Sequence, residues 1–303
     1  MTSSLSSIFH LHFLPSMTLL QLAVASSGSP SPLLGPLPLI HLASRASPIL
    51  NNHTGQLEAF NPITQQLIPQ GPATDAGGQD FDGPAILWII FAFVIGSPMA
   101  FAGIRGWRLT TGVGLGLAAT VCSWAALVNT MGPTGISDLF ILVTVLGFFV
   151  FGFIFGLLEI GRRSGFVMVG ITGGLAFGIR IFILKADLLL PVSNAYGAIW
   201  AIIALMGAIN GMLLVFKKTE RGGLLFACAS IGTFLTFLGV DLVLNRQVGM
   251  SRGLRFLFDR NSSHIVDIIS NGYSPSLLTQ ILLAVSLGLT QFDVQRCCYM
   301  IQH

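Results

Sequence analysis

Two charged residues lie well inside long apolar segments of this sequence, and they are the first candidates for chemistry. Arg180 interrupts the apolar run over residues 165–184, and Asp241 interrupts the run over 222–244. A guanidinium or a carboxylate is costly to bury in apolar surroundings, so residues of this kind are usually paired or functional. Two interpretations stay open: the side chains form an ion pair or reach a polar surface, or they line the mouth of a polar pathway.

The other residues that could carry chemistry argue against an enzyme. The four cysteines show no CxxC or Cys/His metal spacing, and Asp241 is a single aspartate where an intramembrane aspartyl dyad needs two. Residues 114–119 match GxGxxA by count, but no strand precedes them, which argues strongly against a dinucleotide site. All six histidines lie outside the apolar segments: His10, His12, His41, His53, His264 and His303. We therefore expect no catalytic residue, no metal and no cofactor.

The composition indicates that the apolar segments lie in a lipid bilayer. Of 303 residues, 53% are hydrophobic and only 9% are charged, whereas about 25% are charged in soluble domains. A soluble core cannot absorb this much apolar surface, so the chain is expected to be an integral membrane protein in contact with the lipid bilayer. The net charge of +3 is small and the basic residues occur in pairs between apolar runs, so no nucleic acid partner is expected.

The apolar runs after Pro84 predict seven membrane-spanning helices, since about 20 apolar residues cross a bilayer core. The expected fold class is an all-α integral membrane protein, a seven-transmembrane helix bundle. Arg108, Arg163 and Arg221 each open a helix after a short basic turn, which indicates three helical hairpins plus one final helix. The expected helices cover residues 84–104, 109–128, 139–158, 165–184, 197–216, 222–244 and 275–292.

Lysine and arginine predict the orientation, because cytoplasmic turns are enriched in both. The basic turns are 105–108, 162–163 and 217–221. The N-terminus is therefore predicted outside or lumenal and the C-terminus cytoplasmic, although the loop at 245–274 carries four arginines on the predicted outer side. In this orientation Arg180 and Asp241 are both expected near the outer interface, at similar depth.

The segments outside the helices are predicted from composition. Residues 1–25 resemble a signal peptide with cleavage after Ala25, and residues 26–82 are rich in Ser, Pro and Gly, which is typical of a disordered extracellular or lumenal linker. The transmembrane domain is predicted over 83–292 and a short cytoplasmic tail over 293–303.

Two N-x-S/T sequons lie on the predicted outer side, at Asn52 and Asn261, and both are candidate glycosylation sites. The loop at 245–274 mixes apolar residues with its arginines. This pattern predicts a short amphipathic segment on the outer surface, with a ligand-binding cap as the alternative.

Small residues at spacings of four recur in the predicted helices, and such ridges let two helices approach closely in a membrane. Their recurrence favours a tight intramolecular bundle over a dimerisation surface. Asn210, deep in its helix, is expected to form a hydrogen bond with a neighbouring helix, with contact to a solute as the alternative. The packing glycines are Gly112, Gly116, Gly152, Gly156, Gly170, Gly174, Gly178, Gly207 and Gly211.

The glycine-studded helices and their basic turns carry a resemblance to a known family. The segments are Ala102-Gly103-Ile104-Arg105-Gly106-Trp107-Arg108, Gly161-Arg162-Arg163-Ser164-Gly165 and Gly239-Val240-Asp241-Leu242 followed by a long loop. Over residues 84–292 the chain resembles the seven-transmembrane superfamily member 3/transmembrane protein 198-like domain in its fungal form. The resemblance implies a multi-pass protein of seven helices with no established activity, and no functional residue can be carried over.

Short inner turns, few intramembrane charges and many packing glycines favour one functional hypothesis. It is a structural or signalling-accessory component of the secretory pathway or plasma membrane, with membrane or extracellular protein partners that the sequence does not name. The alternative is a channel or transporter for a small solute or ion, lined by Arg180, Asp241 and Asn210. No oligomeric state is predicted.

Overall fold

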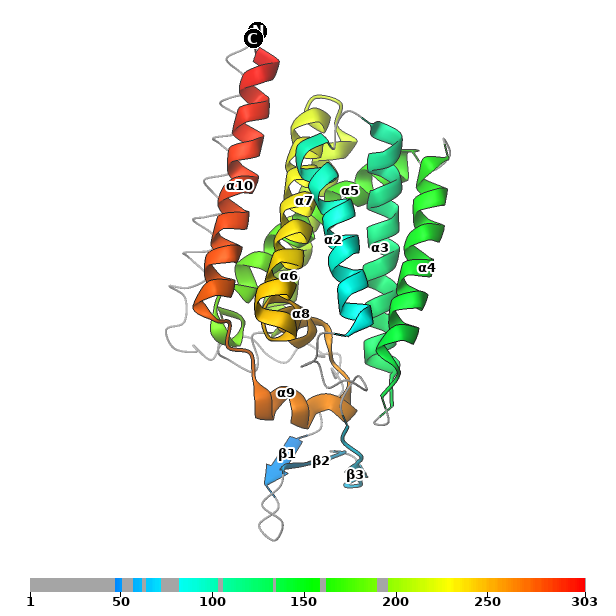
Figure 1. Cartoon of the computed structure of the whole chain (residues 1–303), viewed down its shortest axis with the longest axis vertical. Helices are drawn as coiled ribbons and strands as arrows, with labels where there is room; N and C mark the ends of the chain where they lie inside the picture. The colour runs from blue at the N-terminus through cyan, green and yellow to red at the C-terminus, as the bar shows by residue number, and fades with distance from the viewer. Residues whose placement is uncertain are drawn as a thin grey trace, which may run out of the picture. The chain divides into compact units, whose positions relative to one another are not determined.

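The computed structural model describes residues 47–50, 57–61, 64–71, 82–102, 106–132, 135–158, 162–189 and 196–302. It confirms the all-α membrane bundle of seven helices (Figure 1). Six helices are long and apolar enough to cross a membrane, and the apolar stretch Leu277–Phe292 belongs to the seventh. The helices are α2 (Gly83–Ala102), α3 (Trp107–Thr130), α4 (Asp138–Leu157), α5 (Arg162–Ile183), α6 (Tyr196–Val215), α7 (Glu220–Asn245) and α10 (Leu277–Gln302). The predicted signal peptide and Asn52 lie outside the described residues.

Acidic residues help to set where helices begin. The carboxylate of Asp82 accepts from the amide of Ala85 at 3.1 Å and so caps the start of α2. Asp138 and Glu220 lie in the first turns of α4 and α7, where a negative charge is favourable next to the positive end of the helix dipole. These local signals explain why the predicted boundaries lie close to the observed ones, except that α10 continues to Gln302, through most of the predicted tail.

Three helix pairs plus one final helix are found, as predicted, but the pairs are different. The largest interfaces between described helices join α3 with α4, α5 with α6, and α2 with α7, whereas α4 and α5 touch only slightly. Consecutive helices therefore pack across the loops at 131–137 and 184–195, not across the basic turns. The expected hairpin at 139–184 is not a packed pair.

The glycine ridges explain this pairing, because they face each other across the large interfaces. A Cβ at Gly156 would lie 2.7 Å from the Cα of Gly112, and one at Gly174 would lie 2.8 Å from the Cα of Gly207. Backbone atoms this close leave no room for a side chain. All nine predicted packing glycines meet a neighbouring helix: Gly112, Gly116, Gly152 and Gly156 join α3 to α4, and Gly170, Gly174, Gly178, Gly207 and Gly211 join α5 to α6. Within the described residues they serve intramolecular packing, as predicted.

Sequence reasoning gave little weight to a third glycine interface, between α2 and α7. A Cβ at Gly232 would overlap the backbone of Ala100, and one at Gly96 would lie 2.8 Å from the amide nitrogen of Thr236. Because α2 and α7 lie far apart in the sequence, the spacing alone could not show that these two ridges match.

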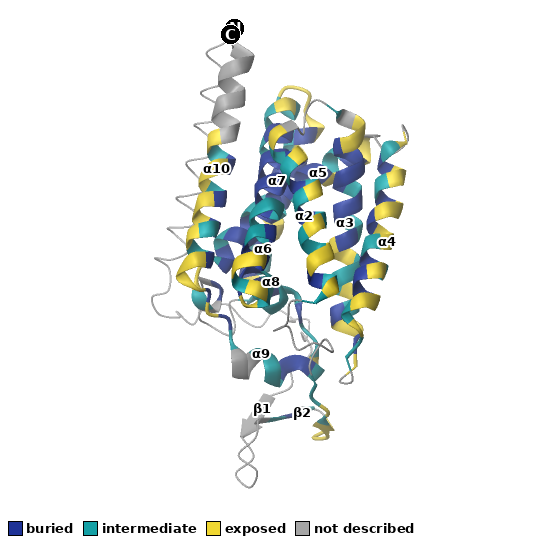
Figure 2. Ribbon diagram, in the orientation of Figure 1, coloured by how far each residue is buried: buried dark blue, intermediate teal, exposed yellow. Residues whose placement is uncertain are grey.

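Two helices form the centre of the bundle. α5 contacts α3, α6 and α7, and α7 contacts α2, α5 and α6. Figure 2 shows α7 largely buried, whereas α2 and α4 carry many exposed positions. The exposed side chains of α4 include Val143 and Phe151, which suit contact with lipid tails.

A cap made of short elements lies at one end of the bundle, and we call this the cap end. It consists of α8 (Met250–Phe258), α9 (Ile265–Asn271) and a three-stranded antiparallel sheet. The strands are β1 (Ser47–Leu50), β2 (Leu57–Phe60) and β3 (Leu67–Ile68), in the order β1-β2-β3. α8 is amphipathic, as predicted for the loop at 245–274, but it packs on α7 and α5.

The strands correct the prediction of a disordered linker over 26–82 for the residues that form them. Ala59 of β2 is fully buried and clusters with Ile265 of α9, against Ile68 and Val266. The side chain of Gln70 adds bonds to the carbonyl of Ser262 at 3.0 Å and the amide of Val266 at 3.1 Å. These partners lie almost 200 residues away in the chain, so a local pattern could not reveal them.

Candidate functional site

Arg180 of α5 is fully buried between three helices. Its Nη1 donates to Thr233 Oγ1 of α7 at 3.0 Å and to Thr290 Oγ1 of α10 at 3.0 Å. The same nitrogen donates to the carbonyl oxygen of Ser286 at 3.1 Å, and Nη2 donates to Ser230 Oγ at 2.7 Å. All these acceptors are neutral oxygens. We call this group the Arg180 cluster: Arg180, Ser230, Thr233, Ser286 and Thr290.

The Arg180 side chain points toward the middle of the bundle, not toward the nearer helix end. Its Nε donates to the carbonyl of Ala176, one turn toward the N-terminus of α5, at 3.1 Å. Helical side chains lean toward the N-terminus of their own helix, and Arg180 lies three residues before the end of α5. Thr233 lies at mid-length of α7, so the guanidinium lies at mid-length too. The expected position near the outer interface is therefore wrong for the charged group.

Asp241 occupies a second polar site, at the cap end of α7. Its Oδ1 accepts from Asn245 Nδ2 at 2.8 Å and from Thr279 Oγ1 of α10 at 2.9 Å. Its Oδ2 accepts from the amide of Met250, the first residue of α8. The carboxylate thus joins α7, α8 and α10, and it satisfies an amide that the start of α8 would leave without a partner.

Arg180 and Asp241 do not form the ion pair that the sequence suggested. Among the described residues no carboxylate lies within 4.0 Å of the Arg180 guanidinium. The physical reason is the direction of the two side chains: Arg180 extends away from the cap end, whereas Asp241 bonds toward it through Asn245 and Met250.

α10 contacts both sites through one polar face. Thr279, Ser286 and Thr290 are fully buried, although each lies in an apolar helix. The sequence analysis did not single out these three residues as partners of the buried charges. Their spacings of seven and four place them on one side of a helix, and that periodicity could have identified them as partners of buried charges.

Asn210 of α6 donates from Nδ2 to the carbonyl of Gly170 in α5 at 2.8 Å. This is the interhelical hydrogen bond that the sequence predicts. The amide is 4% exposed, and its Oδ1 has no partner among the described residues. Asn210 thus strengthens the α5/α6 glycine interface, and it lies apart from the Arg180 cluster because it bonds the other face of α5.

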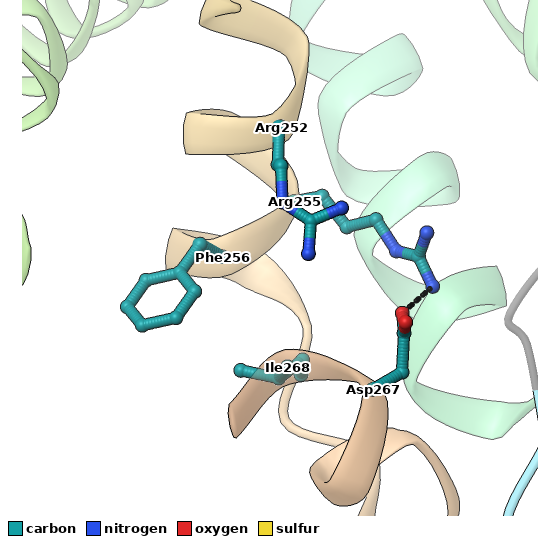
Figure 3. Close-up of a pocket in the computed structure, with 5 residues that line it drawn as sticks. All are labelled: Arg252, Arg255, Phe256, Asp267 and Ile268. Atoms are coloured by element: carbon teal, nitrogen blue, oxygen red, sulfur yellow. Dashed lines mark hydrogen bonds and ion pairs between the residues drawn. The ribbon is translucent and has the colours of Figure 1, made fainter. Parts of the chain in front are cut away.

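The cap contains a small open hollow between α8 and α9, shown in Figure 3. Its arginines already bond to the protein. Arg255 pairs with Asp267 at 3.3 Å and with Asp259 at 3.7 Å, while Arg252 donates to the carbonyl of Gly272 at 2.9 Å. The charges therefore hold the cap together, which weakens the interpretation of the cap as a ligand site.

Tyr273 fastens the cap to the bundle. Its hydroxyl donates to the carbonyl of Ile183, at the end of α5, at 2.6 Å. Burial, and secondly the charge of Asp241, raise the pKa of Tyr273 above its usual range, so the phenol stays a neutral donor at physiological pH.

Asn261 also fastens the cap, and its side-chain amide, the group that a glycan would modify, already forms hydrogen bonds. Its Nδ2 donates to the carbonyls of Met131 and Val128, the latter at 3.4 Å, and its Oδ1 accepts from the amide of Ser263 at 3.0 Å. A glycan on Nδ2 would replace one of these donors and occupy the space of the loop after α3.

We therefore expect Asn261 to carry no glycan in the folded protein. Asn261→Gln should lower the unfolding free energy by about 1 kcal/mol, since side-chain hydrogen bonds contribute on that order. Electrophoretic mobility with and without glycosidase, together with thermal unfolding, checks both parts. Asn52→Gln is the control for the change in electrophoretic mobility. A glycosidase-sensitive band that disappears in Asn261→Gln would contradict this expectation.

Comparison with curated proteins and with solved structures gives no match for this chain. A family description, the TM7S3/TM198-like domain, matches residues 89–293, about two thirds of the sequence. The matched region begins in α2 and ends in α10, so it contains the Arg180 cluster, the Asp241 site and the glycine interfaces. On this evidence the chain belongs to the TM7S3/TM198-like domain family of multi-pass membrane proteins, whose activity is not established.

Proposed function

We propose that the protein is a structural or signalling-accessory component of the secretory pathway or plasma membrane, without transport activity. The observation that supports this proposal is that the polar groups within the apolar helices form hydrogen bonds inside the protein. Arg180 and Asp241 are fully buried and bond to protein atoms of neighbouring helices. A pathway for ions or solutes needs polar groups that face water, whereas these two side chains are bonded to neighbouring helices.

The proposal includes an orientation with the N-terminus outside and the C-terminus in the cytoplasm. Its support is the positive charge of the short turns, in which Arg163, Lys217 and Lys218 are exposed. In this orientation the cap faces outside. Cleavage of the predicted signal peptide and glycosylation at Asn52 are part of the same proposal.

The glycine interfaces add to the case for a structural role. Close backbone contact at Gly156 and Gly174 makes α3/α4 and α5/α6 rigid units. Alternating access requires one bundle to move against another around a fixed site. Here such a movement would have to take place between the pairs, where α5 is in extensive contact with both α3 and α7.

Electrical recording tests the proposal against the channel alternative. Purified protein in a planar bilayer is expected to give no conductance above that of protein-free bilayers, and Asp241→Asn should behave identically. Proteoliposomes under an osmotic gradient should likewise show no solute entry beyond that of empty vesicles. A known channel reconstituted in the same way is the positive control.

A reproducible unitary conductance would overturn the proposal if Asp241→Asn or Arg180→Met altered it. The alternative function, a channel or transporter with these residues along its path, would then replace it.

A further inference from the structure

Among the side chains that the structure describes, no carboxylate pairs with the positive charge of the Arg180 cluster. The acceptors of its guanidinium are the hydroxyls of serine and threonine and two backbone carbonyls. Asp241 of α7 is engaged at the cap end by Asn245 and the amide of Met250. Neutral oxygens satisfy the N–H groups, but they do not balance the charge.

This arrangement is costly in a membrane. A charged side chain at the centre of a bilayer-spanning helix is disfavoured, and attraction to a carboxylate is much stronger in a medium of low dielectric constant than in water. A bidentate carboxylate is also the acceptor that best fits the planar guanidinium. The cluster would therefore gain more from a carboxylate than from the hydroxyls that now contact it.

The helix that covers the cluster is the one least closely packed. α10 shares no extensive interface with another described helix, whereas the other six pack in large pairs. A Cβ at Gly288 of α10 would meet no atom within 4 Å, so no close glycine contact fixes this helix. Ile281 and Val285, on its other face, are exposed. α10 is thus attached through Leu283, which is buried in the hydrophobic core, and through the polar residues Thr279, Ser286 and Thr290.

The hydroxyls of the cluster do not depend on Arg180 as their only partner. Thr233 Oγ1 donates to the carbonyl of Ala229 at 2.7 Å, Ser230 Oγ to Gly173 at 2.7 Å, and Thr290 Oγ1 to Ser286 at 2.8 Å. Withdrawing α10 would therefore leave these donors satisfied. The losses would fall on the guanidinium and on Asp241, which accepts from Thr279 of α10. A new acceptor can restore the bonds of the guanidinium.

From these observations we propose that the face of α5 and α7 around Arg180 is a docking site for a transmembrane helix of a partner protein that carries a carboxylate at mid-depth. α10 occupies this face in the free protein and moves aside when the partner helix binds. The proposal rests on the accessory function proposed above and names the chemistry of its partner.

The first experiment asks whether the cluster lacks a countercharge. Ser286→Asp places a carboxylate on α10 next to Arg180, and Ser286→Asn is its matched neutral control. In the full-length protein Ser286→Asp is expected to unfold about 3 °C or more above Ser286→Asn. In an Arg180→Met background this difference should vanish or reverse. If Ser286→Asp unfolds below Ser286→Asn with Arg180 present, the proposal is overturned.

The second experiment tests docking with a defined probe. The probe is a synthetic single-span helix of leucine and alanine with one central glutamate, and its control has glutamine at that position. Both are labelled and reconstituted with the full-length protein in vesicles of zwitterionic lipid, and association is measured by energy transfer. The glutamate helix should bind about tenfold tighter or more, because desolvated charge pairs couple by at least that factor.

Two variants make the binding result specific. Arg180→Met should reduce binding of the glutamate helix to the level of the glutamine helix. Ser286→Asp should do the same, since α10 then supplies the carboxylate itself, whereas Ser286→Asn should leave binding intact. Equal binding of the two helices, or undiminished binding to Arg180→Met, would overturn the docking site. The conductance measurement is independent of these results, so failure of the accessory function and failure of the docking site can be told apart.

Discussion

Gly174→Leu is expected to abolish the folded bundle. A Cβ at this position would lie 2.8 Å from the Cα of Gly207 and would overlap the carbonyl of Met206. Both are backbone atoms of α6, so no side-chain rotation can relieve the overlap. Leucine adds three further carbon atoms, and α5 and α6 would have to separate along the whole interface. The cost is expected to be on the order of 3 kcal/mol or more, at the upper end for an overpacked core.

Size-exclusion chromatography and thermal unfolding in detergent measure this effect. Gly147→Leu is the matched control, because a Cβ at this glycine of α4 would meet nothing within 4 Å. It should elute and unfold like the wild-type protein. Native-like unfolding of Gly174→Leu would show that α5 and α6 are not closely packed at this point.

Asp241→Ala is expected to lower the unfolding free energy by about 3 kcal/mol. The substitution removes the carboxylate that accepts hydrogen bonds from Asn245, Thr279 and the amide of Met250. The Met250 amide is then buried at the start of α8 without an acceptor. A lost hydrogen bond to a charged group, together with an unsatisfied buried donor, costs on this order. α8 and the cap end of α10 should loosen first, since both attach through this carboxylate. Unfolding in denaturant measures the total loss of free energy, and hydrogen exchange of the amides over 250–258 shows whether α8 loosens first.

Arg180→Met should change the unfolding free energy far less, by about 1 kcal/mol or less, because its lost hydrogen bonds are offset by removal of a buried charge. The double variant Arg180→Met/Asp241→Ala should show additive losses. Thr233 and Asp241 lie two turns apart on α7, about 12 Å along its axis, and sites at this separation without shared partners are additive. If the loss of the double variant differed clearly from the sum of the two single losses, the two residues would be coupled, as in the pair that the sequence suggested.

Much of the bundle could be predicted from the sequence because its signals are local. Helix α4 was expected at 139–158 and is found at Asp138–Leu157, since an apolar run of bilayer length ends where charged residues begin. Glycines four residues apart indicated close helix contacts, and Asn210 indicated an interhelical bond, because both follow from the type of one residue in an apolar helix.

Which helix or strand packs against which other element does not follow from a local pattern, and only the tertiary structure showed it. The glycine ridges of α2 and α7 match across well over one hundred residues, and the strands at 47–68 are stabilised by α9. The sequence contained both sides of each contact, but spacing within one helix does not say which other helix presents a complementary surface.

For the two charged residues in the apolar helices, the sequence and the tertiary structure each determined a part of the answer. Their types and positions in apolar runs were enough to mark Arg180 and Asp241 as the residues to examine. Whether they pair depends on where the side chains extend, and Arg180 reaches back to mid-length, where α7 and α10 supply hydroxyls. A sequence fixes which groups must be satisfied in a membrane, whereas the packing of helices determines which atoms satisfy them, because only packing brings distant residues within hydrogen-bond distance.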